Sequence, residues 1–199
     1  MIAIIDYGMG NLRSVQKAFE FLGCDARITE NKNDLKDASH IVLPGVGAFA
    51  DAASCLEQSG MQQTMLDEIK KGKPFLGICL GMQLLFNKSY ENGEHNGLGL
   101  ISGEVVPFRV DGLKVPHMGW NSLVARDNAL FERDAEKYVY FVHSYHASGV
   151  PEACIIAEAD YGYLFTAAVN KDNVFGLQFH PEKSGDIGLN MLSRFGGLT

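Results

Sequence analysis

Short runs of apolar, often β-branched residues alternate along the first ninety positions with longer segments whose apolar residues recur every three or four positions. The short runs predict buried strands, and the longer segments predict amphipathic helices. This alternation is typical of β-α-β units around a parallel sheet. We predict strands at 2–5, 26–29, 41–43 (closed by Pro44) and 74–78, and helices at 12–22, 61–69 and 79–86, the first capped by Asn11 and Gly23.

The pattern changes after residue 98 to closely spaced apolar runs, which indicate antiparallel or mixed sheet. We predict an α/β fold with a mostly parallel central sheet flanked by helices and an additional antiparallel or mixed region. The polar stretch 89–96 is expected to edge a site rather than to separate domains, so residues 1–199 form one domain. The remaining predicted strands are 101–108, 138–142, 154–159, 166–169 and 174–179, followed by a helix at 187–195.

Composition narrows the class of protein. The chain is 46% hydrophobic and 21% charged, which excludes a disordered protein, and its net charge of −7 with scattered basic residues argues against nucleic acid as a partner. No uncharged apolar run approaches the ~18 residues of a membrane span, and no basic leader precedes Asp6, so a cytoplasmic location is expected. The cysteines at 24, 55, 79 and 154 show neither CxxC nor zinc spacing. We expect no metal, cofactor or disulfide, and assign Cys24, Cys55 and Cys154 to packing.

Cys79 stands between two glycines in the segment GICLG at 77–81, where the strand period changes to the helical period. Flanking glycines at a strand-to-helix turn allow the sharp bend that exposes a nucleophile. The free N–H groups at the start of the following helix favour a thiolate there. The alternative is an inert cysteine that fills the core.

His180 and Glu182 follow the last predicted strand in the segment FHPE at 179–182. A thiol nucleophile needs a base that takes its proton and an acid group that orients that base. Because strand ends converge at one edge of a parallel sheet, Cys79, His180 and Glu182 can supply all three roles. His143 and His146 are rival bases, although neither is followed two residues later by an acidic residue.

Two glycine-rich turns follow predicted strands. The segment PGVGAF at 44–49 can turn a backbone N–H toward a developing oxyanion, with the N–H of Leu80 as a second donor, or it is an ordinary connecting loop. The segment GMGNLR at 8–13 stands where a dinucleotide-binding fingerprint would begin, but Arg13 replaces its third glycine. We interpret the second segment as a tight turn.

Three strings, GICLGMQ at 77–83, PGVGAF at 44–49 and QFHPEKS at 178–184, together resemble the class I (triad-type) glutamine amidotransferases over the whole chain. Within this class, DYGMGN at 6–11, PHMGWN at 116–121 and FVHSY at 141–145 are most similar to the glutaminase subunits of imidazole glycerol phosphate synthases. The resemblance implies that Cys79 attacks the side-chain amide of glutamine, His180 transfers protons and Glu182 orients His180. It further implies oxyanion donors at Val46 and Leu80 and glutamine-binding residues Gly47, Gln83, Ser144 and Tyr145.

The resemblance also implies a partner. Free ammonia would be protonated in water, so such glutaminases deliver it through a closed passage to a synthase, here a separate (β/α)8 cyclase in a heterodimer. Asn11, Tyr140 and Lys183 are expected at the docking face, and the nucleotide substrate of the partner is expected to stimulate a weak basal activity.

Three alternatives remain open. The chain could serve another synthase, such as one for anthranilate, guanylate or pyridoxal phosphate. It could be a free-standing cysteine hydrolase of γ-glutamyl compounds, fully active alone. It could also be a non-catalytic regulatory subunit, although the intact set of Cys79, His180 and Glu182 argues against this.

Overall fold

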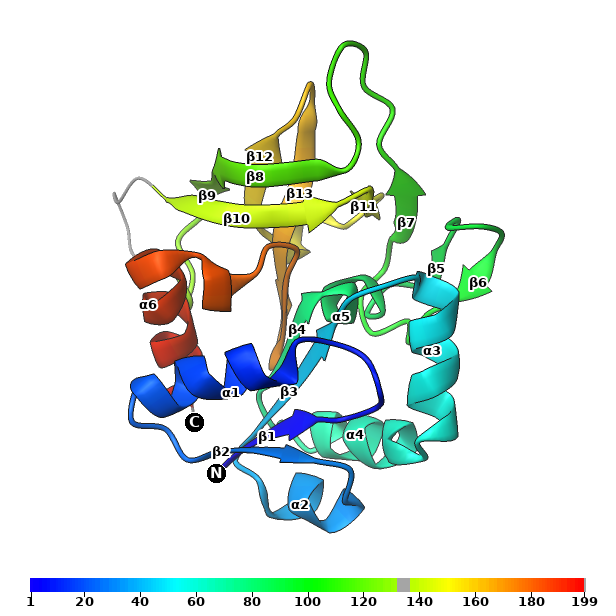
Figure 1. Cartoon of the computed structure of the whole chain (residues 1–199). Coiled ribbons are helices and arrows are strands. Elements are labelled where there is room, and N and C mark those ends of the chain that lie inside the picture. Colours follow the sequence, from blue (N-terminus) through cyan, green and yellow to red (C-terminus); the bar gives the residue numbers. More distant parts are fainter. Residues whose placement is uncertain (132–136, 199) are drawn as a thin grey trace.

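The computed structural model describes residues 1–131 and 137–198, which are built around a mostly parallel sheet (Figure 1). β1 (Ile2–Ile5) pairs in parallel with β2 (Ala26–Thr29) and β3 (His40–Gly45). β4 (Phe75–Cys79) pairs in parallel with β3 and with β14 (Val174–Leu177). Every residue of β1, β3, β4 and β14 is buried, so helices must cover both faces of this part of the sheet.

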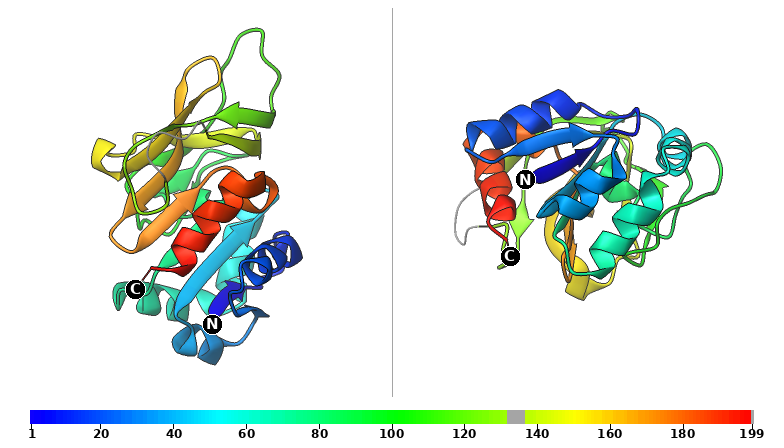
Figure 2. Two further views of the ribbon diagram at one scale, coloured as in Figure 1. Left: turned by 90° about the vertical axis from the view of Figure 1, so that its left-hand side faces the viewer. Right: turned by 90° about the horizontal axis from the view of Figure 1, so that it is seen from below.

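The helices form one layer on each face, as Figure 2 shows from below. On one face, α1 (Leu12–Phe21) and α6 (Gly185–Gly196) pack apolar residues against the sheet. On the other face, α2 (Lys32–Asp37), α3 (Phe49–Gln58) and α4 (Met61–Lys70) contribute to a second core cluster. The predicted α/β fold with flanked parallel strands is therefore confirmed.

Beyond β14 the sheet continues with mostly antiparallel pairings and one parallel pairing, in agreement with the antiparallel or mixed region that the closely spaced apolar runs predict. Within the described residues the large sheet has twelve strands, in the order β2-β1-β3-β4-β14-β13-β11-β7-β5-β6, while β12 pairs with β13 and β9 pairs with β12. Its remaining strands are β5 (Lys88–Ser89), β6 (His95–Asn96), β7 (Glu104–Pro107), β9 (Val124–Ala125), β11 (Tyr145–Ser148), β12 (Ile155–Asp160) and β13 (Leu164–Lys171), and short 3-10 helices span Glu152–Cys154 and Pro181–Lys183.

A separate two-stranded antiparallel sheet, β8 (His117–Ser122) with β10 (Tyr138–His143), lies beyond the carboxyl ends of the parallel strands (Figure 1). Backbone contacts attach it to the segment after β14. The His180 N–H donates to the Tyr140 carbonyl at 3.0 Å, and the Tyr140 N–H donates to the Ser184 hydroxyl at 3.0 Å. The small sheet therefore adjoins the predicted catalytic histidine.

The predicted helix at 79–86 is too long, because α5 spans only Leu80–Gln83. The carbonyls of Leu84, Leu85 and Phe86 accept hydrogen bonds from residues 98, 101 and 99 instead of continuing the helical ladder. The segment 98–101 lies far along the chain, so this competition between local and tertiary hydrogen bonds is not visible in the periodicity.

Other boundaries also differ from the prediction. Pro44 lies inside β3, opposite Ile78, rather than closing the strand. Asn11 precedes α1, but its side chain makes no capping hydrogen bond to the described residues. The C-cap residue is Leu22, and Gly23 follows it with φ of +77°. The stretch 89–96 includes the second residue of β5 and the whole of β6, and the sequence does not predict α2, α3, β8, β9 or β11. In α3 the alanine-rich spacing is a weak apolar signal.

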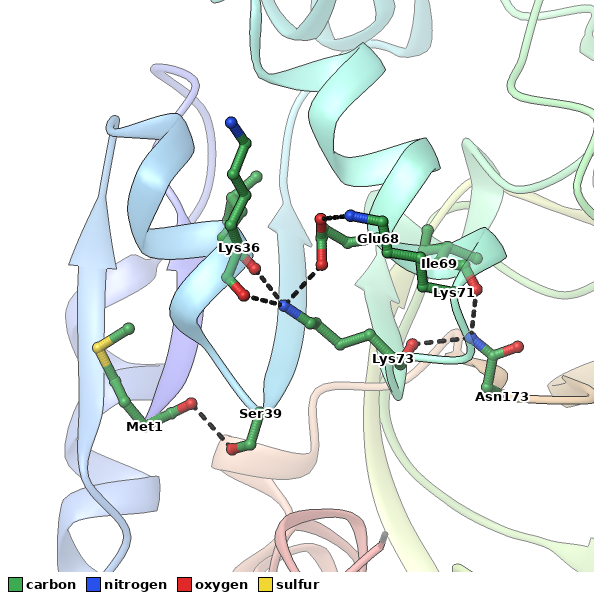
Figure 3. A network of polar contacts seen from close by, with 9 residues as sticks. Met1, Lys36, Ser39, Glu68, Ile69, Lys71, Lys73 and Asn173 are labelled. Carbon is green, nitrogen blue, oxygen red and sulfur yellow. Dashed lines mark hydrogen bonds and ion pairs between the residues drawn. The ribbon is translucent and has the colours of Figure 1, made fainter.

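A buried ionic network ties two of these helices to the start of β4 (Figure 3). The Lys73 ammonium lies 2.9 Å from Glu68 Oε2 and donates to the carbonyls of Leu35 and Lys36 in α2. Lys71 approaches the other oxygen of Glu68 at 2.6 Å. Because the Glu68 side chain is only 6% exposed, the two lysines stabilise a carboxylate that burial alone would disfavour. Together they hold α2 and α4 at the end of the sheet opposite to Cys79.

Candidate active site at the carboxyl edge of the sheet

The last residue of β4, Cys79, occupies a sharp turn with φ of +56° and ψ of −109°, a strained conformation for a residue with a side chain. The two neighbouring glycines are sterically required. A Cβ at Gly81 would lie 1.8 Å from the carbonyl oxygen of Leu43, and one at Gly77 would lie 2.5 Å from that of Gly81. The structure therefore has the strand-to-helix turn that the spacing of glycines predicts, with the thiol at its apex.

The carboxyl ends of β3, β4 and β14 converge at this edge, as predicted for parallel strands. They border a cavity of about 380 Å³. Both Cys79 and His180 line it, so the topology brings together residues 101 positions apart. The lining residues are Val46, Gly47, Cys79, Leu80, Gln83, Glu91, Pro116, Val142, His143, Ser144, Tyr145 and His180.

His180 has the environment of a base that shares its proton with a nucleophile. Its Nδ1 lies 2.8 Å from Glu182 Oε1, and the two side chains are 3% and 1% exposed. Its Nε2 is buried without a hydrogen-bond partner among the described residues. Burial lowers the pKa of His180, but the nearby Cys79 and Glu182 side chains outweigh this effect and raise the pKa to about 9. The protonated form of His180 is therefore favoured at pH 7, next to Cys79 and Glu182.

A row of side-chain amides lies behind the thiol. Gln178 Nε2 is 3.8 Å from Cys79 Sγ, and Gln178 Oε1 accepts from Gln83 Nε2 at 3.1 Å. Gln83 Nε2 also donates to the Tyr145 carbonyl at 3.0 Å. Of these, Gln178 is not singled out by the sequence, although its place two residues before His180 puts it on the same side of an extended chain.

The expected oxyanion loop at 44–49 contacts Tyr7, which directly precedes the glycine-rich turn at 8–13. Buried Tyr7 donates its hydroxyl to the Pro44 carbonyl at 2.9 Å, and burial raises the pKa of Tyr7, which keeps this donor protonated. Gly8 and Gly10 have φ of +85° and +109°, values that favour glycine, so the tight turn predicted for the segment 8–13 is confirmed. Gly47, with φ of +105°, follows in the loop itself.

Neither rival histidine is placed to act as the base. His143 lines the cavity, but both its ring nitrogens have partners, Tyr145 O at 2.8 Å and the ring of His117 at 3.0 Å. Burial lowers the pKa of His143 to about 3. The ring nitrogens of His146 contact the Ala147 carbonyl and the Tyr163 hydroxyl, and His146 does not line this cavity.

The cavity also includes Glu91, which the sequence singles out only as part of the loop 89–96. Its Oε2 accepts from the Phe49 N–H at 2.8 Å, at the start of α3 just after the oxyanion loop. The stretch 89–96 therefore borders the cavity, as the sequence predicts, with the Glu91 side chain as its contribution to the wall. Of the predicted docking residues, Asn11 and Lys183 are exposed, and the Lys183 ammonium lies 6.0 Å from the ring centre of the half-buried Tyr140.

Within residues 1–131 and 137–198, no group of three or more His, Cys, Asp or Glu side chains is arranged to hold a metal ion, and no helix could cross a membrane. Cys24, Cys55 and Cys154 are partly buried free thiols, whereas Cys79 is buried at the cavity.

Comparison with known proteins shows the family to which the chain belongs. The family profile described as glutamine amidotransferase class-I matches residues 3–196. The chain therefore belongs to the class I glutamine amidotransferase family.

Curated relatives narrow the assignment within this family. Proteins named imidazole glycerol phosphate synthase subunit HisH are 51% identical in Caldanaerobacter subterraneus subsp. tengcongensis (100% of this chain, 98% of the relative), and 52% identical in Sulfurimonas denitrificans (98% and 97%). The protein of that name in Bacillus subtilis is 47% identical (98% and 95%).

Solved structures share the fold. A structure titled glutamine amidotransferase matches with a TM-score of 0.78 and 19% identity over 100% of both chains. A chain of PurLQS from Thermotoga maritima matches with a TM-score of 0.76 and 21% identity over 98% of this chain and 96% of its own.

Proposed function

We propose that this chain is the glutaminase subunit of an imidazole glycerol phosphate synthase, acting as one domain over residues 1–199. Identity near 50% over essentially the full length of relatives with that name carries the proposal. The grouping of a thiol, a histidine and a carboxylate around one cavity supplies the chemistry that a glutaminase needs.

In the first half of the reaction, the Cys79 thiolate attacks the side-chain amide carbon of glutamine. The negative charge that forms on the amide oxygen is stabilised by the backbone N–H groups of Val46 and Leu80, which follow the paired strand ends Gly45 and Cys79. His180 then gives its Nε2 proton to the departing nitrogen. The C–N bond breaks, ammonia leaves and a glutamyl thioester remains.

In the second half, neutral His180 takes a proton from water as the water oxygen attacks the thioester carbon. The C–S bond breaks, glutamate is released, and the thiolate–imidazolium pair is restored. Glu182 stabilises the imidazolium through the 2.8 Å hydrogen bond to Nδ1 and keeps Nε2 facing the cavity.

Substrate recognition uses the remaining walls of the cavity. Gly47, Gln83, Ser144 and Tyr145 surround the space next to the thiol. The Glu91 carboxylate lies in the same wall and has the charge to pair with the α-ammonium of glutamine.

The ammonia acceptor is proposed to be a (β/α)8 cyclase that docks over the cavity. The exposed side of the β8–β10 sheet supports this, because Met118, Trp120 and Tyr138 are 61%, 57% and 47% exposed, which is unusual for such large apolar groups gathered on one small sheet. Asn11, Tyr140 and Lys183 are proposed at the same face. Both subunits would act in the cytoplasm.

Glutamate release tests this function. The purified chain is assayed alone, with a cyclase of the histidine pathway, and with the cyclase plus its phosphoribulosyl formimino aminoimidazole carboxamide ribonucleotide substrate. A large rise only in the third mixture is expected. Equal rates in every mixture would instead indicate a free-standing hydrolase, and no activity in any mixture would indicate a different synthase.

The nucleophile is tested separately by mass spectrometry after incubation with an electrophilic glutamine analogue. Cys79 is expected to carry the label, and the partly buried Cys24, Cys55 and Cys154 are internal controls. A label on another cysteine would overturn the assignment of the nucleophile.

A further inference from the structure

A line of hydrogen bonds leads from the β8–β10 sheet to the cavity. His117 on β8 and His143 on β10 stand opposite each other in the antiparallel register, and both are buried. His117 Nδ1 lies 3.0 Å from His143 Nε2, and His143 Nδ1 lies 2.8 Å from the carbonyl oxygen of Tyr145. Neither ring belongs to the proposed proton-transfer machinery.

The contact of His143 with the Tyr145 carbonyl determines which ring nitrogens of the two histidines carry protons. A carbonyl oxygen only accepts, so His143 Nδ1 must carry the proton that it donates to Tyr145. In a neutral ring, His143 Nε2 is then an acceptor. Its partner, His117 Nδ1, must therefore be the donor.

The contact of His117 with Asn121, at the other end of the line, independently indicates the same tautomers. The amide of Asn121 is oriented by the backbone, because its Oδ1 accepts from the Ser122 N–H at 2.8 Å and its Nδ2 donates to the Asp160 carbonyl at 2.7 Å. Asn121 Nδ2 also lies 3.3 Å from His117 Nε2, so this nitrogen must be an acceptor. Both ends therefore require neutral histidines with the proton on Nδ1.

Packing keeps the ring of His117 in its plane. It is stacked between Phe141 and Tyr161, with ring centres 4.7 Å and 4.0 Å away and interplanar angles of 27° and 28°. Burial lowers the pKa of His117 to about 4 and that of His143 to about 3, so both rings are neutral at pH 7.

The Tyr145 carbonyl joins this line to the cavity. It accepts from His143 Nδ1 and also from Gln83 Nε2, at 2.8 and 3.0 Å. Gln83 in turn contacts Gln178, whose Nε2 approaches the Cys79 thiol. Rotation of this carbonyl would release two donors and move a wall of the proposed glutamine site.

We propose that His143, held in its Nδ1–H form by His117, is a positioning residue for the glutaminase reaction. It holds the Tyr145 carbonyl and, through it, the Gln83 amide in the arrangement that receives glutamine. The inference rests on the proposed function, and neither histidine exchanges a proton with the substrate.

Two substitutions at one position separate the two hydrogen bonds. In His143→Asn the side-chain amide reaches the position of Nδ1 and can still donate to Tyr145, whereas in His143→Gln it reaches the position of Nε2 and can only meet His117. His146→Gln is the matched control, because His146 is also a buried neutral histidine on the next strand and does not contact the cavity.

Steady-state glutaminase kinetics are measured in the complex with the cyclase and its nucleotide substrate. His143→Gln is expected to raise KM for glutamine about tenfold, the effect of one lost hydrogen bond at the bound substrate, with a smaller change in kcat. The rise in His143→Asn should be markedly smaller, and His146→Gln should leave KM unchanged. Equal KM values in all three variants, or a loss of kcat alone, would overturn the proposal.

The tautomers are tested in the unmodified chain, independently of activity and of how the variants fold. Long-range 1H–15N NMR spectra at pH 7 should show both His117 and His143 protonated at Nδ1, with a scalar coupling across their mutual hydrogen bond. An Nε2–H form or an imidazolium at either ring would contradict the proposal. An inactive wild-type complex that nevertheless has these spectra would contradict the proposed function instead.

Discussion

Only a hydrogen atom fits at the side-chain position of Gly81, because a Cβ there would lie 1.8 Å from the Leu43 carbonyl oxygen. Gly81→Ala is therefore expected to shift the backbone beneath Cys79, destabilise the chain by about 1–3 kcal/mol and lower glutaminase activity at least ~100-fold. Urea unfolding and the stimulated glutaminase assay measure these effects. Gly197→Ala is the control, since a Cβ there meets only ordinary contacts at 3.6 Å. If both alanine variants behave alike, the elbow does not depend on this glycine.

The proton on His180 makes stability depend on pH. The folded pKa of about 9 lies above the ordinary 6.5, so between these values the folded chain holds a proton that the unfolded chain has lost. This contribution to the free energy of unfolding is complete below pH 6.5 and is lost as the pH rises through about 9. Urea unfolding of wild type from pH 6 to 9.5 should show this fall. Glu182→Gln removes one cause of the raised pKa and should show a shallower fall, and parallel curves would contradict the account.

At the scale of elements, the lysine in front of β4 links two helices that do not adjoin in sequence. The Lys73 side chain is 11% exposed and contacts Glu68 as well as the last carbonyls of α2 (Figure 3). Lys73→Met keeps the apolar stem but leaves a buried carboxylate with one partner. We expect it to destabilise the chain by about 1–3 kcal/mol, measured by urea unfolding.

Lys70→Met serves as the comparison, because Lys70 is exposed on α4, the helix that carries Glu68. An equal loss in both variants would show that the network adds nothing to ordinary surface charge. The hydrogen bonds from Lys71 and Lys73 also lower the pKa of Glu68, so this contribution is present above its ordinary pKa near 4.5 and is lost as the pH falls below it.

At the scale of the whole molecule, the small sheet β8–β10 has two functions in this account. Its buried side carries the histidine pair toward the cavity, and its exposed side presents Trp120. Trp120→Ala is expected to weaken binding of the cyclase about 30-fold, as removal of a central aromatic side chain does at many interfaces, and to leave the stability of the isolated chain within ~0.5 kcal/mol. Calorimetric titration with the cyclase measures the affinity.

Phe21→Ala provides a matched surface aromatic, since Phe21 is 79% exposed at the far end of α1 from Asn11. It should leave the affinity unchanged. If Phe21→Ala weakens cyclase binding and Trp120→Ala does not, the partner docks on another face.

Local sequence determined much of the parallel half. The short apolar runs at 2–5 and 74–78 and the segment 26–29 identified the strands β1, β4 and β2. The segment GICLG indicated the turn at Cys79, because a Cβ on either neighbouring glycine would clash with backbone atoms. The pairing of His180 with Glu182 could also be predicted from the sequence, since the base and its carboxylate are two positions apart.

Tertiary structure alone decided the rest, because the deciding contacts join distant residues. The helix after Cys79 ends at Gln83, since the segment 98–101 takes its next carbonyls. Gln178 contacts the thiol only because β14 pairs beside β4. Likewise, His143 has the signature of a rival base in the sequence, and becomes a neutral donor only when β8 places His117 against it and burial removes water from both rings.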